Sequence, residues 1–517
     1  MRNGLFSTVI VFSLIVNLLF VKEIKAEDGV NNAPANVIII VADQMRRSSM
    51  SFWQQPDFIE KLNGNADFVY TPNLDLLANN GVVFTDAIAN YPLCSPFRGM
   101  LLSGRYPNNN GVDNNTRTDR PSVGLRTDIS TLPQILNHEG YNTALVGKGH
   151  WHNNLPLFDD TGRYVGKSDA PGGHFIKGTR FDTFIPEGPS RLGIEYWYQT
   201  IGHNHNNPTV YTNDLTISGQ PEGTPYYPKQ YSAVDQANVI IDYIDNTHKQ
   251  RDLKKPFAML WMMDPPHSPY LSVKDTDAQI YKQYYQDVSI TEVLNRPNVN
   301  LDIAKNAAKI HFSMVTLIDR EIGRVMTKLK QNGLADNTLI VFTADHGEMM
   351  GSHSKMAKNE FYEESLGIPL IFYFPAKLAN RTTDLLISVP DFMPTILGLL
   401  NVPSTTFEDI DGTSYSDYLL SKRARYDLPM SSLYYGKNSE LGVRTHQYTY
   451  ILNGQGEQLA LFDNLQDPYQ LNSLDMDDLP AADALFLKQQ LGGWLASINH
   501  PWHELNKYPN SIYYPKR

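Results

Sequence analysis

Short, continuous apolar runs recur along the chain and alternate with polar and helix-like stretches. Four such runs lie at residues 37–41, 143–146, 257–263 and 339–342. Runs of this length without alternation are typical of strands that are buried on both faces of a parallel sheet. Before the last run, apolar residues spaced by three or four positions from Ile310 to Leu329 predict a helix that ends at Gly333. The pattern therefore predicts an α/β fold with a large, mostly parallel central sheet flanked by helices.

The pattern changes near residue 403. Beyond it, shorter segments with alternating apolar and polar positions appear, for example at 442–452 and 457–462. Such alternation predicts half-buried strands, so we expect a smaller C-terminal α+β subdomain. The expected organisation is a leader at 1–26, a main domain at 27–405 and the C-terminal subdomain at 406–517. Residues 151–255 and 268–299 are rich in Gly, Pro, Asn and Tyr, and we expect them to form long loops over the sheet.

The first 26 residues are typical of an export signal peptide. Arg2 precedes an apolar run at 5–21, and the small residue Ala26 stands at a plausible cleavage point. A membrane anchor is the alternative, but polar residues interrupt the run and it barely reaches the length needed to span a bilayer. No later segment has that character, so we expect a periplasmic or secreted protein without a stable membrane anchor.

Composition and charge narrow the functional classes. Apolar residues make up 41% and aromatic residues 11% of the 517 positions, which supports a sizeable core and excludes global disorder. The net charge of −11 argues against a nucleic-acid partner, so any polyanionic substrate must meet a local cluster of cations. The sequence has one cysteine, Cys94, which can form no internal disulfide and is therefore inert, exposed or chemically used.

Polar residues follow each of the four predicted strands. In chain order they are Asp43 and Gln44, Lys148 and His150, Asp264 and His267, and Asp345 and His346. Because ligands bind beyond the carboxyl ends of the strands in open α/β sheets, we expect these side chains to meet at one edge. Asp43 and Asp345, with an oxygen from Gln44 and a contact from His346, could bind a hard divalent cation. Calcium or magnesium fits these atoms better than zinc.

The segment around the lone cysteine reads Cys94-Ser95-Pro96-Phe97-Arg98. Proline favours the first position of a helix, so we predict that a helix opens at Pro96. Cys94 would then lie just ahead of the helix amino terminus, where the dipole favours anionic groups. Arg98 adds a fixed positive charge nearby.

This segment resembles the signature of the formylglycine-dependent sulfatases, which belong to the alkaline-phosphatase-like superfamily. In that family a dedicated enzyme oxidises the signature cysteine to formylglycine. Here Cys94, Pro96 and Arg98 match the signature, and Leu102-Ser103-Gly104-Arg105 follow them as in the family. Further family elements are matched in order by residues 71–75, 81–85, Gly147-Lys148-Gly149-His150, Pro266-His267-Ser268-Pro269, Asp345-His346-Gly347-Glu348, Lys358 with 361–365, and 461–468. The resemblance therefore covers most of the chain after the leader.

The resemblance implies a chemical role for the matched residues. Formylglycine hydrates to a geminal diol, of which one hydroxyl attacks sulfur and the other, once deprotonated, expels sulfate and regenerates the aldehyde. It also implies a calcium ion, bound by the modified side chain of Cys94 together with Asp43, Gln44, Asp345 and His346. The resemblance further implies that Arg98 and Lys148 lie beside the formylglycine oxygens and stabilise them. It implies that His150 is the base for sulfate expulsion. His267 and Lys358 would bind the sulfate, and one of the two would protonate the leaving oxygen.

Three positions depart from the common pattern of that family. Gln44 stands where many members have a second aspartate, His346 where they have asparagine, and Phe97 where they have a small residue. We still expect conversion of the cysteine, although Phe97 could reshape the floor of the pocket. His203 and His205 invite a second metal site, but no carboxylate follows at ligand spacing. We interpret their segment as a polar loop that touches substrate or nothing.

The leading functional hypothesis is hydrolysis of sulfate esters on a sulfated carbohydrate, for example ulvan, another algal polysaccharide or its oligosaccharides. The formylglycine-generating enzyme would be a partner during maturation. The choice of substrate rests on family analogy. Two alternatives stay open: a phosphonate monoester or phosphodiester hydrolase of the same superfamily, and a noncatalytic glycan-binding relative.

Overall fold

The structure is a computed structural model that describes residues 34–117, 119–120, 122–152, 175–176, 179–180, 182–407, 409–423 and 425–504. These residues belong to a compact unit that begins at Pro34. The expected signal peptide at 1–26 lies outside the described residues. Within the described ranges, no helix is long and apolar enough to cross a membrane.

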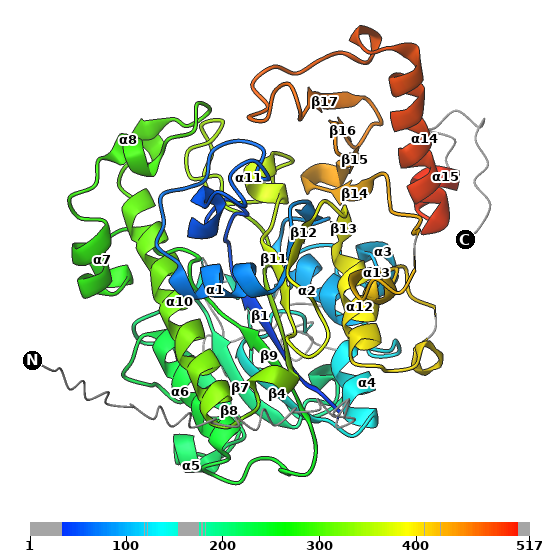
Figure 1. Cartoon of the computed structure of the whole chain (residues 1–517). Helices are drawn as coiled ribbons and strands as arrows, with labels where there is room; N and C mark the ends of the chain where they lie inside the picture. Colours follow the sequence, from blue (N-terminus) through cyan, green and yellow to red (C-terminus); the bar gives the residue numbers. More distant parts are fainter. Residues whose placement is uncertain are drawn as a thin grey trace, which may run out of the picture. The chain divides into compact units, whose positions relative to one another are not determined.

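Nine strands of the described residues form the central sheet (Figure 1). Their order across the sheet is β12 (Arg381–Thr383), β2 (Val82–Phe84), β11 (Leu370–Tyr373), β10 (Thr338–Ala344), β1 (Asn36–Ala42), β9 (Phe257–Met262), β4 (Asn142–Lys148), β7 (Tyr196–Ile201) and β8 (Thr209–Thr212). The four strands predicted from apolar runs are β10, β1, β9 and β4, which are adjacent and parallel. The pairs of β11 with β10 and β2, and of β7 with β8, are antiparallel. The predicted α/β fold with a mostly parallel sheet is confirmed.

Helices cover both faces of the sheet, which explains why β1 is buried along its whole length. Trp261 of β9 donates from Nε1 to Oε1 of Gln236 in α6 (Ser232–Asp245) at 3.0 Å. The preceding residue, Leu260, instead lines a small cavity with Leu136 of α4 (Leu132–His138). Successive side chains of a strand point to opposite faces, so α6 and α4 pack on opposite sides of the sheet.

The helix predicted before β10 is α10 (Ala308–Gln331). Most of its apolar residues from Ile310 to Leu329 are buried, and Gly333 follows with a positive φ of 67°. Glycine adopts this left-handed conformation without the steric cost of a Cβ atom, so it can end the helix here.

Residues 182–255 contain regular elements where we expected long loops. Strands β7 and β8 extend the sheet beyond β4, and α6 packs against α10. The expectation of loops failed for the strand Tyr196–Ile201 because Gly-, Asn- and Pro-rich turns surround this aromatic segment and obscure its pattern. It failed for α6 because the helical spacing of its apolar residues was overlooked; these residues are Ala233, Ala237, Ile240 and Ile244. Residues 268–299 contain only short helices, α7 (Ala278–Tyr284) and α8 (Ile290–Val293) among them.

The C-terminal part forms the expected smaller α+β subdomain. Its antiparallel sheet consists of β14 (Ser432–Tyr435), β15 (Leu441–Arg444), β16 (Tyr448–Leu452) and β17 (Gln458–Asp463), in chain order. Helix α14 (Ala481–Ser497) packs against β15 and buries Leu487, Leu491 and Leu495. The boundary near residue 405 stays a prediction.

Shorter elements connect these layers. The helices are α1 (Pro72–Asn80), α2 (Cys94–Ser103), α3 (Pro107–Asn110), α5 (Leu215–Ser218), α9 (Leu301–Ala304), α11 (Glu363–Leu366), α12 (Phe392–Leu399), α13 (Ser416–Leu419) and α15 (Pro501–Glu504). Two further small sheets pair β3 (Ala87–Ile88) with β13 (Ile387–Ser388) and β5 (Phe175–Ile176) with β6 (Thr179–Arg180).

Candidate active site

The structure brings together the polar residues that follow the four central strands. Lys148 ends β4, and its Nζ contacts Oδ2 of Asp43, which follows β1. Nε2 of His346 lies 3.7 Å from Oδ1 of Asp43 and 3.3 Å from Oδ1 of Asp345. These ends meet because β1 and β10 are in register up to Ala42 and Ala344. All four side chains are buried.

Cys94 reaches this cluster from the first turn of α2. The helix begins at Cys94 itself, two residues before the predicted start at Pro96. The first backbone N–H groups of a helix have no intrahelical acceptor, so a proline, which lacks the N–H, is tolerated anywhere in that turn. The N–H of Phe97 donates to Leu93 O at 3.1 Å and closes the turn. The prediction that Cys94 lies ahead of the helix was therefore wrong, because Cys94 is the first residue of the helix, although it does lie at the amino end.

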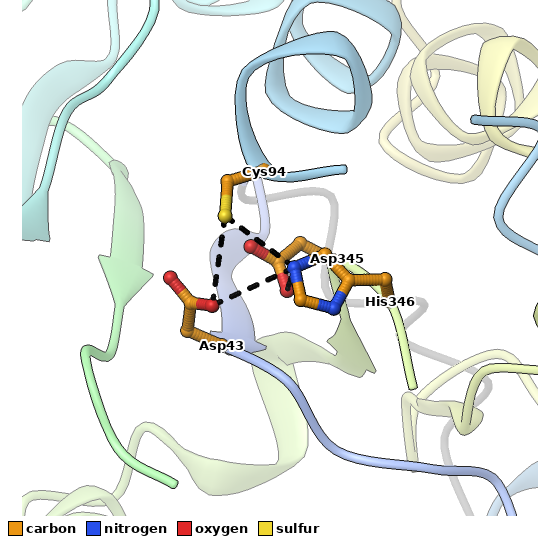
Figure 2. A group of neighbouring side chains, drawn as sticks. All are labelled: Asp43, Cys94, Asp345 and His346. Carbon is orange, nitrogen blue, oxygen red and sulfur yellow. Dashed lines mark hydrogen bonds and ion pairs between the residues drawn. The ribbon is translucent and has the colours of Figure 1, made fainter. Parts of the chain in front are cut away.

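The thiol of Cys94 points into the cluster (Figure 2). Its Sγ lies 3.1 Å from Nζ of Lys358, 3.4 Å from Nε2 of His346 and 3.9 Å from Oδ1 of Asp43. Burial and the charge of Asp43 both raise the pKa of the thiol, but Lys148, Lys358 and His346 together hold that pKa well below its usual value. The Cys94 thiol therefore lies among cations that favour its ionised form, an environment typical of a reactive rather than an inert cysteine.

Four side chains among the described residues could hold a metal ion: Asp43, Cys94, Asp345 and His346. One ligating atom of each lies within 4.8 Å of the others (Figure 2). His346 donates its Nδ1–H to Gly347 O at 3.0 Å, so the lone pair on Nε2 faces the group. Gln44 brings a further oxygen, since its Oε1 lies 3.0 Å from Nζ of Lys358. Two carboxylates, an amide oxygen and an imidazole fit a divalent cation.

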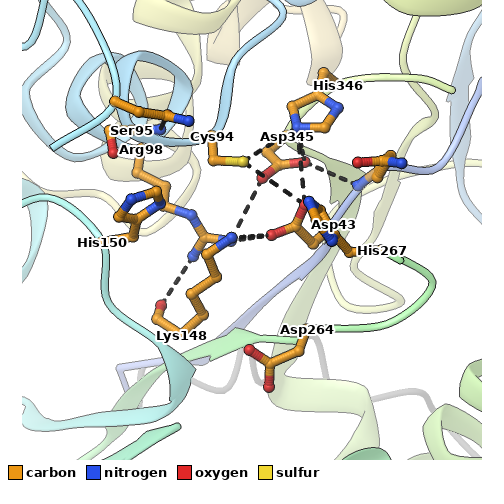
Figure 3. Close-up of polar contacts among 12 residues, drawn as sticks. Asp43, Cys94, Ser95, Arg98, Lys148, His150, Asp264, His267, Asp345 and His346 are labelled. Carbon is orange, nitrogen blue, oxygen red and sulfur yellow. Dashed lines mark hydrogen bonds and ion pairs between the residues drawn. The ribbon is translucent and has the colours of Figure 1, made fainter. Parts of the chain in front are cut away.

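Buried cations compensate the two carboxylates. Nη2 of Arg98 lies 3.6 Å from Oδ2 of Asp43 and 3.5 Å from Oδ2 of Asp345, and its Nη1 donates to Lys148 O at 2.8 Å (Figure 3). Burial raises the pKa of Asp43, but Lys148 and the neighbouring cations outweigh it and hold that pKa well below its usual range. Asp345 lies beside the charge of Asp43, so burial and this charge raise the pKa of Asp345 to about 6. Of the two carboxyl groups, Asp43 therefore has the lower pKa.

His150, His267 and Lys358 complete the predicted set. His150 lies beside Arg98, and its Nε2 is 3.3 Å from Thr116 O (Figure 3). His267 donates its Nδ1–H to Ser268 O at 2.9 Å, and burial followed by the charge of Lys358 lowers its pKa well below the usual value. The structure therefore brings all the predicted catalytic and metal-binding residues to one edge of the sheet.

Two residues of one other segment support this set and were not predicted to do so. The ring of His203 stacks on that of His267 at 3.8 Å, and Nε2 of His205 lies 2.8 Å from His267 O. Their segment follows β7, which was not recognised as a strand. The rule that ligands bind beyond strand ends would have pointed to it.

Phe97 and Asp264 differ from the expectations placed on them. Phe97 is fully buried in the main hydrophobic core and lines no surface of the cluster directly; whether it shapes the floor of the site stays a prediction. Asp264 is fully buried below the cluster, where its Oδ2 accepts from Nε2 of Gln236 at 3.1 Å (Figure 3). Burial raises the pKa of Asp264 to about 7.

The sheet topology and this site define a hydrolase of the alkaline-phosphatase-like class. The model of the family described as Sulfatase matches residues 35–402, and a second model, N-sulphoglucosamine sulphohydrolase, C-terminal, matches residues 351–493. The chain belongs to the sulfatase family and is a sulfuric ester hydrolase.

Several relatives are similar to the chain over nearly its whole length. An "Endo-4-O-sulfatase" of Bacteroides thetaiotaomicron is 34% identical, over 90% of this chain and 93% of the relative. An "Ulvan-active sulfatase" of Formosa agariphila is 29% identical, over 90% and 81%. A solved sulfatase structure from work on glycosaminoglycan metabolism by Bacteroides thetaiotaomicron superposes with a TM-score of 0.82 at 33% identity, covering 91% of this chain and 98% of that one.

Proposed function

We propose that the protein hydrolyses sulfate esters of a sulfated glycan, with a formylglycine formed from Cys94 as the nucleophile and a calcium ion at the adjoining site. The observation that carries this proposal is the position of the buried Cys94 thiol within 3.1 Å of Lys358 and 3.4 Å of His346, beside two carboxylates. Once hydrated, the aldehyde supplies two hydroxyls on one carbon, one to take up the sulfuryl group and one for its release.

Calcium is the proposed cation because oxygen atoms dominate the donor set. Asp43, Gln44, Asp345 and His346, with the side chain at position 94, would hold the ion. When bound, calcium would act as a Lewis acid that polarises a sulfate oxygen.

The chain's own residues then divide the remaining work. Lys148 keeps positive charge near the side chain at position 94, and Arg98 lies 3.6 Å from the adjoining Asp43; both would stabilise oxygen anions formed there. His150 would accept the proton whose removal releases sulfate. His267 and Lys358 would bind the sulfate group, and one of them would protonate the leaving alcohol oxygen.

Maturation and export form part of the same proposal. The formylglycine-generating enzyme would act on the segment that contains Cys94, and a signal peptide at residues 1–26 would direct the protein to the periplasm or out of the cell. We keep a catalytic domain at 27–405 and a C-terminal subdomain at 406–517 as the proposed organisation.

The proposed substrate class is a sulfated polysaccharide or its oligosaccharides. One relative is named for endo-4-O-sulfatase activity and another for activity on ulvan, and both names support a glycan substrate. The activity of this protein on algal and on glycosaminoglycan polymers can therefore be compared directly. The test is sulfate release from ulvan oligosaccharides and from chondroitin 4-sulfate, measured by ion chromatography. Release from neither, with an aryl sulfate still hydrolysed, would contradict a role in glycan degradation.

Only similarity of fold supports the alternative that the protein is a phosphonate monoester hydrolase. A phosphonate monoester hydrolase of Agrobacterium radiobacter superposes with a TM-score of 0.61 at 20% identity. Rates on matched aryl sulfate and aryl phosphodiester substrates separate the two activities, and a dominant phosphodiester rate would contradict the sulfatase proposal. A noncatalytic glycan binder would not need the buried set of Lys148, His150, His267 and Lys358, and its binding would survive Cys94→Ala.

A further inference from the structure

Glu348 lies directly behind Gln44 and has no part in the proposed chemistry. Its side chain is fully buried. Its Oε1 accepts from the backbone N–H groups of Met350 at 2.8 Å and Ala357 at 2.7 Å. Its Oε2 accepts from the hydroxyl of Tyr270 at 3.2 Å and from the amide Nε2 of Gln44. Both carboxylate oxygens are therefore held by hydrogen bonds to fixed donors.

These contacts determine which end of the Gln44 amide faces the site. The amide has a donor end and an acceptor end, and a half-turn of its plane exchanges them. The donor Nε2 faces Glu348, which only accepts, and the acceptor Oε1 faces Nζ of Lys358 at 3.0 Å, which only donates. The opposite orientation would set two acceptors against each other on one side and two donors on the other. The network therefore permits one orientation, with oxygen toward the site.

The backbone of Gln44 is fixed as well. Its N–H donates to Oδ1 of Asp345 at 3.0 Å, and its φ of 72° is left-handed, which is uncommon for a residue other than glycine. The Cα position of Gln44 is therefore fixed beside Asp345, a proposed metal ligand. What remains to be determined is which end of the Gln44 amide points toward the site.

We infer that Glu348 is a positioning residue that turns the oxygen of Gln44 toward the cation and so makes this glutamine a metal ligand. The inference rests on the calcium site of the proposed function. A carboxylate at position 44 would present oxygen from either end and would need no such partner, whereas a glutamine presents oxygen only when its amide is held. Glu348 supplies that restraint through one buried hydrogen bond.

The direct test is the calcium affinity of Glu348→Gln, measured by isothermal titration of calcium into the metal-free protein. The backbone donors of Met350 and Ala357 keep oxygen at the Oε1 position, so the new NH₂ group takes the place of Oε2 and faces Nε2 of Gln44. Two donors then oppose each other, and the Gln44 amide turns its NH₂ toward the cation. We expect calcium affinity to fall by about 10- to 100-fold, the usual cost of losing a partner that orients a metal ligand.

Two further variants make this test specific. Tyr270→Phe removes the other donor to Oε2 but keeps the contact between Gln44 and Glu348, so calcium affinity stays close to that of the wild type. The exchange of Gln44→Glu with Glu348→Gln keeps the total charge and restores a donor facing an acceptor. We expect it to recover the affinity lost in Glu348→Gln.

The outcomes distinguish this inference from the proposed function. A wild-type protein that binds no calcium overturns the calcium site and the inference together. Wild-type binding with undiminished affinity in folded Glu348→Gln overturns the inference alone, and so does a folded exchange variant that binds no better than Glu348→Gln. If Glu348→Gln does not fold, Glu348→Asp decides, because the shorter side chain keeps the charge but withdraws the acceptor from Nε2 of Gln44. A lowered calcium affinity in folded Glu348→Asp upholds the inference, and an undiminished affinity overturns it.

Discussion

Replacing Lys148 with methionine removes the principal cation beside Asp43, a fully buried carboxylate of the site. Nζ of Lys148 contacts Oδ2 of Asp43, and the two side chains are 3% and 0% exposed. Breaking a buried ion pair by removing one partner costs about 3–5 kcal/mol of stability. Arg98 at 3.6 Å and Lys358 at 4.0 Å stay near Asp43, so we expect the lower end, about 3 kcal/mol, in the metal-free protein.

The size of this loss depends on pH in a defined direction. The pKa of Asp43 is lowered in the folded protein, so its contribution to stability is fully present above its unfolded pKa of about 3.9 and is lost as pH falls through the lower folded pKa. The pKa of Lys148 is raised, because Asp43 and Cys94 outweigh the opposing effect of burial, and its contribution persists up to the unfolded pKa of about 10.4 and beyond. The deficit of Lys148→Met is therefore the same at pH 5 and pH 7 and shrinks below about pH 4.

The assay is urea unfolding of the metal-free protein, followed by tryptophan fluorescence, with Lys437→Met as the matched control. Lys437 makes the same kind of ion pair, with Oε1 of Glu360 at 2.6 Å, but is 37% exposed. An exposed pair contributes about 0–1 kcal/mol, so the control changes stability little. If Lys148→Met lost no more stability than Lys437→Met, the reasoning that Asp43 depends on this buried lysine would be refuted.

Three other predictions address the scaffold and the metal. Glu364→Gln destabilises the protein at pH 7 by about 3–5 kcal/mol, because Glu364 is buried against Arg296 at 3.1 Å and its pKa is lowered to about 2. Urea unfolding shows this loss of stability above about pH 4.3. The loss disappears as pH falls toward 2. Gly147→Ala yields little folded protein on size exclusion, because a Cβ atom would lie 2.0 Å from Met262 O at a φ of 110°; normal folding would contradict the geometry. Chelation with EDTA abolishes sulfate release from aryl sulfate, and added calcium restores it; activity that survives chelation would argue against the ion.

The sequence predicts the centre of the fold better than its edges. Strands β1, β4, β9 and β10 are buried on both faces, so they stand out as continuous apolar runs. Strand β7 lies next to an edge strand and carries aromatic and polar residues, so its pattern resembles the loops around it. Helix α2 begins earlier than the proline suggests because its first turn can accommodate the missing N–H.

Some residues of the site can likewise be predicted from the sequence, and others cannot. Residues that follow a central strand, such as Asp43 and Asp345, can be placed from the rule for strand ends. Lys358 follows no strand, and only the family resemblance identified it; it reaches Gln44 across 314 positions of sequence. Glu348 forms part of a matched motif, but its contact with Gln44 depends on the register between β1 and β10 and is therefore visible only in three dimensions.

The proposed function depends above all on Cys94 being the precursor of the nucleophile. Mass spectrometry of the peptide that contains Cys94, taken from protein whose sulfatase activity has been measured, tests it most directly. We expect active preparations to carry an aldehyde in place of the thiol, activity to rise with the converted fraction, and Cys94→Ala to release no sulfate. A fully active preparation in which Cys94 keeps its sulfur quantitatively would contradict the account.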